Sequence, residues 1–285
     1  MSDKGMSKES LAAAGNERYA FTTKKQIVYP EGETVIWHGY IRHNFELEGH
    51  KGFIVEPPHP AQGLPWSWCL QWAESFVPRT PALQLLDRGF HHVHIDVFET
   101  YMNDEGVRIL EKFYDMLQKM HFHKKAALIG MSYGGLFSWR WAAEHPETVG
   151  AMYLDAPVCS LSFAGDRDET NTNPTLIPFM QTEYKKHLAA YGVADVEGLR
   201  KHPKNPLNNY LPIAKAKIPT LVIRSGQDQS VLPETNIDIM EKLIKDAGGE
   251  IEIINRNLYG HHPHGMDDPT PLTGFILRHY PDFEI

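Results

Sequence analysis

The stretch Gly130-Met131-Ser132-Tyr133-Gly134-Gly135 decides the fold of this chain. It follows a short apolar run at 126–129 and precedes a stretch at 136–143 whose composition favours a helix. A strand, a G-x-S-x-G turn and a helix in this order are typical of a nucleophile elbow, which presents a serine hydroxyl at the end of a strand. Glycines permit the strained turn and a close approach of the helix because they lack a Cβ. The sequence therefore predicts that Ser132 is a nucleophile.

A base and an acid for this serine follow later in the chain. A serine hydroxyl is a weak nucleophile unless a neighbouring base takes its proton. Asp228 lies in a loop after the apolar stretch 219–223, and His261 lies in a loop after the alternating stretch 251–254. Loops at the carboxyl ends of parallel strands open on one edge of the sheet. We therefore expect Ser132, Asp228 and His261 to converge as a catalytic triad, in a chain order known for such triads.

The chain resembles the α/β-hydrolase superfamily over about residues 24–280, and most closely its bacterial dienelactone-hydrolase-like and acetyl-esterase-like members. The resemblance implies an α/β fold with a mostly parallel eight-stranded sheet flanked by helices and carrying a cap insertion. It also implies a serine hydrolase that cleaves carboxylic esters through an acyl-enzyme on Ser132, with acylated carbohydrates among the expected substrates. The segments that carry it are the elbow, 155–158, 205–207, 214–219 and 260–271.

Two of the three triad positions have rivals close by. His262 and His264 stand beside His261, but the family pattern places the base directly after a glycine, which favours His261. Asp155 also ends an expected strand, yet the loop of Asp228 has the glycine, acidic and Val-Leu-Pro pattern expected after the seventh strand. We therefore expect Asp155 to be structural.

Acyl transfer also needs two donors aimed at the developing oxyanion. One is expected to be the backbone N–H of Tyr133, the residue after the nucleophile. The second is expected from the turn after the stretch 66–72, where Leu70-Gln71-Trp72-Ala73 replaces the usual His-Gly signature. The prediction is the backbone N–H of Trp72, with Ala73 as the alternative.

Alternation of apolar and polar stretches predicts one domain. Residues 1–23 are expected to form a polar N-terminal tail, and residues 24–285 the α/β-hydrolase domain, with a cap or lid insertion at about 159–212 where the regular pattern breaks. Strands are expected at 26–29, 34–37, 52–56, 66–72, 92–97, 126–129, 149–155, 219–223 and 251–254. Helices are expected at 81–87, 105–119, 182–191, 234–246 and 270–280.

Composition limits the classes of partner. The net charge of −8 gives no attraction to nucleic acid or anionic lipid, so we expect neither a nucleic-acid nor a membrane partner. Two cysteines cannot build a disulfide framework, and the first residues lack the apolar run of a secretory signal. A cytoplasmic location is expected, while a signal peptide removed from further upstream stays an alternative. The expected partner is a small-molecule ester, and a homodimer is the candidate assembly.

The sixteen histidines raise the question of a metal site. They include clusters at 91–94 and 261–264, but neither cluster has a carboxylate or cysteine at ligand spacing, so no metal and no cofactor are expected. Other functions remain open. The Ser-Tyr-Gly-Gly elbow also resembles serine peptidases of the prolyl-oligopeptidase type, an acyltransferase would differ only in the attacking alcohol, and a non-catalytic ligand-binding relative would share the fold.

Overall fold

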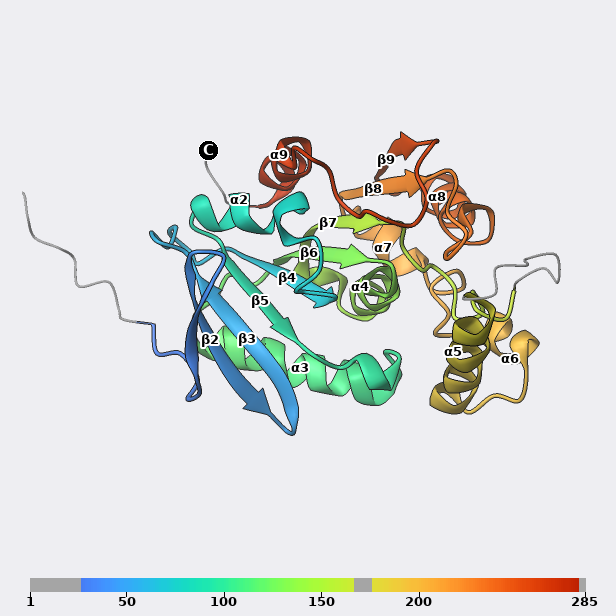
Figure 1. Cartoon of the computed structure of the whole chain (residues 1–285), viewed down its shortest axis with the longest axis horizontal. Helices are drawn as coiled ribbons and strands as arrows, with labels where there is room; N and C mark the ends of the chain where they lie inside the picture. The colour runs from blue at the N-terminus through green and yellow to red at the C-terminus, as the bar shows by residue number, and fades with distance from the viewer. Residues whose placement is uncertain (1–26, 167–175, 282–285) are drawn as a thin grey trace, which may run out of the picture.

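The computed structural model describes residues 27–166 and 176–281, so the predicted tail at 1–23 lies outside the described residues. Within them, one sheet of nine strands has the order β1-β2-β3-β5-β4-β6-β7-β8-β9 (Figure 1). The strands are β1 (Thr34–Trp37), β2 (Tyr40–Leu47), β3 (His50–Glu56), β4 (Trp66–Gln71), β5 (His91–Ile95), β6 (Ala126–Met131), β7 (Val149–Asp155), β8 (Thr220–Ser225) and β9 (Ile251–Arg256). The helices are α2 (Ala82–Asp87), α3 (Asp104–Lys119), α4 (Tyr133–Glu144), α5 (Leu176–Tyr191), α6 (Val196–Lys201), α7 (Leu211–Lys215), α8 (Ile237–Asp246) and α9 (Thr270–His279), with short 3₁₀ turns at Val77–Arg79, Phe98–Thr100, Pro146–Thr148 and Pro233–Thr235.

The sheet is antiparallel at one end and parallel elsewhere. Strand β1 pairs antiparallel with β2, β2 pairs antiparallel with β3, and β3 pairs antiparallel with β5. From β5 through β4, β6, β7 and β8 to β9, neighbouring strands run parallel. The carboxyl ends of these parallel strands therefore share one edge, which is where an α/β sheet places its ligands.

The predicted number of eight strands is wrong, because the sheet has nine. Strand β2 was not predicted, since its residues are mostly polar and only Phe45 is buried. The predicted strand at 26–29 is also wrong: residues 27–29 belong to no strand, and Gln26 lies outside the described residues. The ring of Tyr29 stacks on His43 at 3.9 Å, so this segment packs through its side chains rather than by backbone pairing.

Helices cover both faces of the sheet. One apolar core joins the sheet to α3, α4 and α8, and a second joins it to α2 and α9 on the opposite face (Figure 1). Helix α3 begins at a good cap, because the side chain of Asn103 accepts hydrogen bonds from the N–H groups of Glu105 and Gly106. Its buried residues recur at helical spacing, from Val107 to Leu117. Helix α4 is buried on nearly all sides, as expected for the helix after an elbow.

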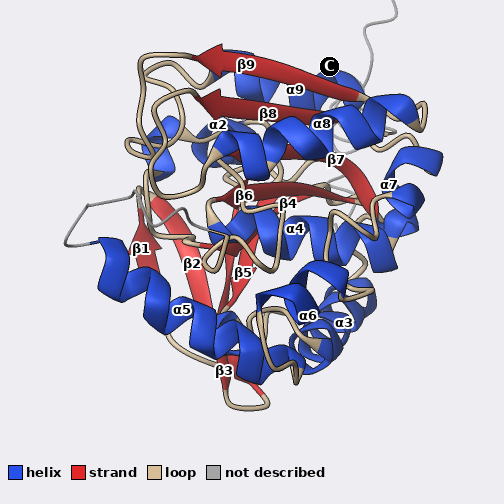
Figure 2. Ribbon diagram, turned by 90° about the vertical axis from the view of Figure 1, so that its right-hand side faces the viewer, coloured by secondary structure: helices blue, strands red, loops and turns tan. Residues whose placement is uncertain are grey.

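The segment between β7 and β8 holds α5, α6 and α7. Figure 1 shows α5 and α6 beyond the carboxyl ends of β6 and β7, and Figure 2 shows α5 crossing in front of the sheet edge. Helix α5 includes the predicted helix at 182–191 and extends back to Leu176. The predicted helix at 234–246 is interrupted at Asn236, whose side-chain oxygen accepts a hydrogen bond from the backbone N–H of Cys159. This bond ties the start of α8 to the start of the inserted segment.

Candidate active site

Ser132 stands between β6 and α4 with φ 53° and ψ −117°, in the left-handed half of backbone space that non-glycine residues rarely adopt. The turn leaves no room for side chains on its flanking glycines. A Cβ on Gly130 would lie 2.5 Å from the carbonyl oxygen of Gly134, and one on Gly135 would lie 2.3 Å from the Cβ of Pro157. The strained turn that the motif predicts is therefore present, and it requires both glycines.

A chain of hydrogen bonds links Ser132 to the two residues predicted to serve it. His261 Nε2 lies 3.0 Å from Ser132 Oγ, and His261 Nδ1 lies 2.7 Å from Asp228 Oδ2. The other oxygen of Asp228 accepts the backbone N–H groups of Ser230 at 2.8 Å and Val231 at 2.9 Å. Asp228 is buried, and this network fixes its carboxylate toward His261. The structure thus brings the three predicted residues together in the geometry of a nucleophile, a base and an orienting acid.

The two predicted oxyanion donors lie beside Ser132. Tyr133 is the first residue of α4, and the first N–H groups of a helix have no partner within the helix. Trp72 follows the end of β4 with φ 64°. Both residues line the same cavity as Ser132; Trp72 also lines a second cavity, which it shares with the alternative Ala73.

The cavity at Ser132 has a volume of about 290 Å³. Its apolar wall includes Phe179 and Met180 of α5, so the segment between β7 and β8 covers the site. The remaining lining residues among those described are Trp72, Ser75, Phe76, Ser132, Tyr133, Phe163, Ser230, Val231, His261, His262 and His264.

The family is settled by comparison with known proteins. The family model described as the alpha/beta hydrolase fold matches residues 32–187, which is more than half of the chain. The chain belongs to the alpha/beta hydrolase fold family. The predicted superfamily and fold class are thereby confirmed.

One curated relative of this alpha/beta hydrolase is acylamino-acid-releasing enzyme 1 of Oryza sativa subsp. japonica, 29% identical over 146 residues. The match covers 51% of this chain but only 18% of that enzyme. Among solved structures, Pyrococcus horikoshii acylaminoacyl peptidase superposes with a TM-score of 0.57 at 13% identity, covering 86% of this chain and 42% of the other. A 2,6-dihydroxy-pseudo-oxynicotine hydrolase gives 0.60 at 17% identity, covering 85% and 68%. These two structural likenesses show a shared fold.

Among the helices of the described residues, none combines the length and the apolar character that a membrane-spanning helix needs.

The rival acid Asp155 has a partner of its own in this hydrolase. Its Oδ1 lies 2.8 Å from His264 Nδ1, and its Oδ2 accepts the N–H of Gly265 at 2.8 Å and the hydroxyl of Tyr153 at 3.1 Å. Asp155 is fully buried, and burial raises the pKa of the Tyr153 hydroxyl, which keeps it a donor. A second buried aspartate–histidine pair therefore lies beside the first. The sequence signal for it was the cluster of three histidines within four positions.

Sequence reasoning missed a buried cluster around the side chain of Tyr133. The Tyr133 hydroxyl donates to Glu183 Oε2 at 2.7 Å and lies 3.2 Å from His187 Nε2. Glu183 and His187 are buried residues of α5. Burial lowers the pKa of His187 to about 4, so its ring is neutral near pH 7. The only hint in the sequence was their spacing of four residues on one expected helix, which places them on one face.

Proposed function

We propose that this chain is a serine hydrolase that cleaves small carboxylic esters through an acyl-enzyme on Ser132. The observation that carries the proposal is the chain of hydrogen bonds from Asp228 through His261 to Ser132 Oγ. Membership of the alpha/beta hydrolase fold family supports hydrolysis as the reaction class. The strained elbow supports Ser132 as the nucleophile, because strain of this kind persists where the surrounding structure holds a functional group in place.

Each residue has one role in the proposed reaction. His261 Nε2 takes the hydroxyl proton as Ser132 Oγ attacks the ester carbonyl, and then returns it to the leaving alcohol. Asp228 keeps the proton of His261 on Nδ1 and stabilises the imidazolium. The backbone N–H groups of Tyr133 and Trp72 stabilise the oxyanion. Loss of one such donor raises the activation free energy of acyl transfer by about 3 kcal/mol. Water activated by the same histidine then releases the acid and restores Ser132.

The size of the cavity supports small substrates. Its volume of about 290 Å³ lies just below the roughly 300–1,000 Å³ typical of small-molecule pockets. Aromatic and aliphatic side chains dominate its wall, including Phe76 and Phe163. We propose that a short acyl group occupies this cavity and that the segment between β7 and β8 acts as its cap.

A serine peptidase is the second candidate, because the curated relative is an acylamino-acid-releasing enzyme. Peptidase and esterase reactions share the acyl-enzyme, and they differ in whether an amine or an alcohol leaves. A matched pair of substrates separates them: the p-nitrophenyl ester and the p-nitroanilide of the same N-acetyl amino acid. Turnover of the ester alone supports the esterase, whereas comparable turnover of both favours the peptidase.

The nucleophile itself is tested by labelling. We expect a fluorophosphonate probe to add once to the wild-type protein, as measured by intact mass, and not to Ser132→Ala. Ester hydrolysis should disappear in the same variant. A folded wild-type protein that neither reacts with the probe nor turns over any ester would contradict the proposal and favour a ligand-binding role.

A further inference from the structure

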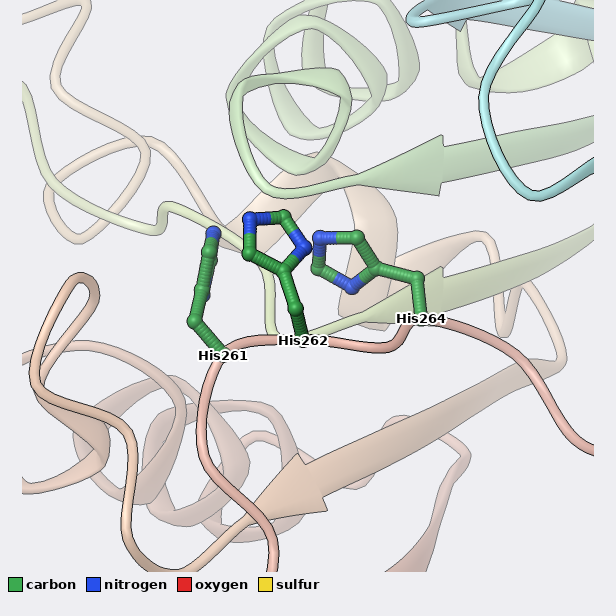
Figure 3. Close-up of side chains that lie close together, drawn as sticks. All are labelled: His261, His262 and His264. Carbon is green, nitrogen blue, oxygen red and sulfur yellow. The ribbon is translucent and has the colours of Figure 1, made fainter.

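Three histidines of the loop after β9 face one another beside Ser132. Figure 3 shows His262 between His261 and His264, all on one short stretch of chain. One ring nitrogen from each can be chosen so that all three atoms lie within 4.8 Å of one another. All three side chains line the cavity at Ser132. No other group of three or more histidine, cysteine, aspartate or glutamate side chains in the described part of the chain is arranged in this way.

Two of these rings are already oriented as metal ligands are. His261 and His264 each direct Nδ1 at a buried carboxylate, Asp228 and Asp155 respectively. A histidine that binds a metal usually donates its other ring N–H to a carboxylate, which fixes the tautomer and makes the ligating nitrogen more basic. The tautomer with the proton on Nδ1 leaves the lone pair of Nε2 available. The catalytic role proposed for His261 requires this same tautomer.

The surroundings hold this loop in place. Arg79 Nε donates to the carbonyl oxygen of His264, and Arg256 donates to the carbonyl oxygens of Pro263 and Gly265. Arg79 is itself paired with Asp267. The backbone is thus fixed. The side chain of His262 is exposed, and its ring stacks on that of Phe76 with the centroids 5.5 Å apart.

We propose that His261, His262 and His264 form a binding site for a borderline divalent cation, with Zn²⁺ as the best fit, and that the bound cation inhibits the enzyme. Three neutral imidazoles plus one open position are a donor set that suits Zn²⁺. Bonds of about 2.0–2.1 Å in tetrahedral geometry need nitrogens about 3.4 Å apart, so rotation of His262 closes the site. The hydroxyl of Ser132 lies 3.0 Å from His261 Nε2, on the side where the cation would bind. A cation on His261 Nε2 occupies the lone pair that would otherwise accept the Ser132 proton.

Binding is tested separately from activity. The inhibition rests on the role proposed for His261, whereas the binding does not, so binding is measured on Ser132→Ala, which keeps all three ligands. We expect one Zn²⁺ per chain by competition with a chromophoric chelator, and tetrahedral absorption bands when Co²⁺ is added instead. His262→Ala should weaken Zn²⁺ binding by more than the roughly 10- to 100-fold that loss of a ligand's hydrogen-bond partner costs. His262→Cys should restore it, because a thiolate also binds Zn²⁺.

His59→Ala is the matched control, since this exposed histidine lies outside the cluster. It should leave Zn²⁺ binding unchanged.

The inhibition is tested in the active wild-type enzyme. Zn²⁺ should inhibit ester turnover there, and EDTA should reverse the inhibition. In His262→Ala, the ratio of turnover rates with and without Zn²⁺ should approach one. No binding to Ser132→Ala, or binding that His262→Ala does not weaken, overturns the site. Stoichiometric binding without inhibition of an active enzyme overturns the inhibitory role. An inactive wild type that still binds Zn²⁺ would contradict the esterase proposal alone.

Discussion

Tyr133 donates a hydrogen bond from its hydroxyl to Glu183 Oε2 at 2.7 Å, and this bond joins the residue after Ser132 to helix α5. The Tyr133 ring is buried and packs edge-to-face against Phe98 and Phe163. Its backbone N–H is the proposed oxyanion donor, so one residue contacts both the reacting atoms and the segment that covers them. The position of α5 is therefore coupled to the oxyanion site.

This coupling predicts the behaviour of Tyr133→Phe and Glu183→Gln. Each variant removes or weakens the hydrogen bond between Tyr133 of α4 and Glu183 of α5. Each should therefore lower kcat/KM by about tenfold, which is equivalent to a rise of about 1.4 kcal/mol in the activation free energy. The double variant should lose much less than the sum, because both single changes remove the same interaction. Ester kinetics on the four proteins of the cycle measure this. Strictly additive effects would show that the two side chains act independently.

Asp228→Asn should keep the fold and lose turnover. An asparagine oxygen can still accept the N–H groups of Ser230 and Val231, so circular dichroism and the unfolding midpoint should change little. The amide no longer holds His261 in the required tautomer, and the same change in a known serine protease costs about 10⁴ in kcat. Ester turnover at saturating substrate is the measurement. Unchanged turnover would transfer the acid role to Asp155 or remove the triad.

Asp155→Ala should lose stability and keep most of its turnover, the reverse of what is expected for Asp228→Asn. It leaves His264, the Gly265 N–H and the Tyr153 hydroxyl buried without their partner, which should lower the free energy of unfolding by about 3 kcal/mol or more. Urea unfolding measures this loss. Turnover per folded molecule should stay far above that of Asp228→Asn. A stable Asp155→Ala protein without turnover would show that Asp155, rather than Asp228, serves the reaction.

Buried histidines predict a loss of stability in mild acid. Burial lowers the pKa of His187 and His91 to about 4 and that of His92 to about 3, from 6.5 in the unfolded chain. The folded state therefore binds fewer protons, so this stability is present above pH 6.5 and is lost as the pH falls toward 4. Each histidine contributes up to about 1.4 kcal/mol per pH unit in this window.

Protonation of carboxylates can also lower the stability of a folded protein in acid. The contribution of a histidine to this pH dependence is therefore isolated with the variant His92→Gln. This variant should unfold with a shallower dependence on pH, by up to about 1.4 kcal/mol per unit between about pH 5.5 and 4. Urea titrations at several pH values measure the slope for both proteins. Equal slopes would mean that His92 is not a source of the acid sensitivity.

The elbow and the order of the triad could be predicted from the sequence because their signals are local. A strand, a turn with glycines at fixed positions and a helix follow one another within about twenty residues, and Gly130 answers a steric need of the turn itself, because a Cβ there would meet the carbonyl oxygen of Gly134. Strand β2 was missed because polar residues dominate it, and the pairing of a half-exposed strand depends on its neighbours more than on its own propensity.

The sequence by itself determined the fold family, the elbow and the loops that carry Ser132, Asp228 and His261. Only the tertiary structure decided which carboxylate faces which histidine, because Asp155 and His264 lie 109 positions apart and meet through the parallel register of β7, β8 and β9. It also decided the contact of Glu183 with Tyr133, which depends on how α5 packs over the sheet edge. Contacts between distant segments are set by packing, and no local pattern encodes them.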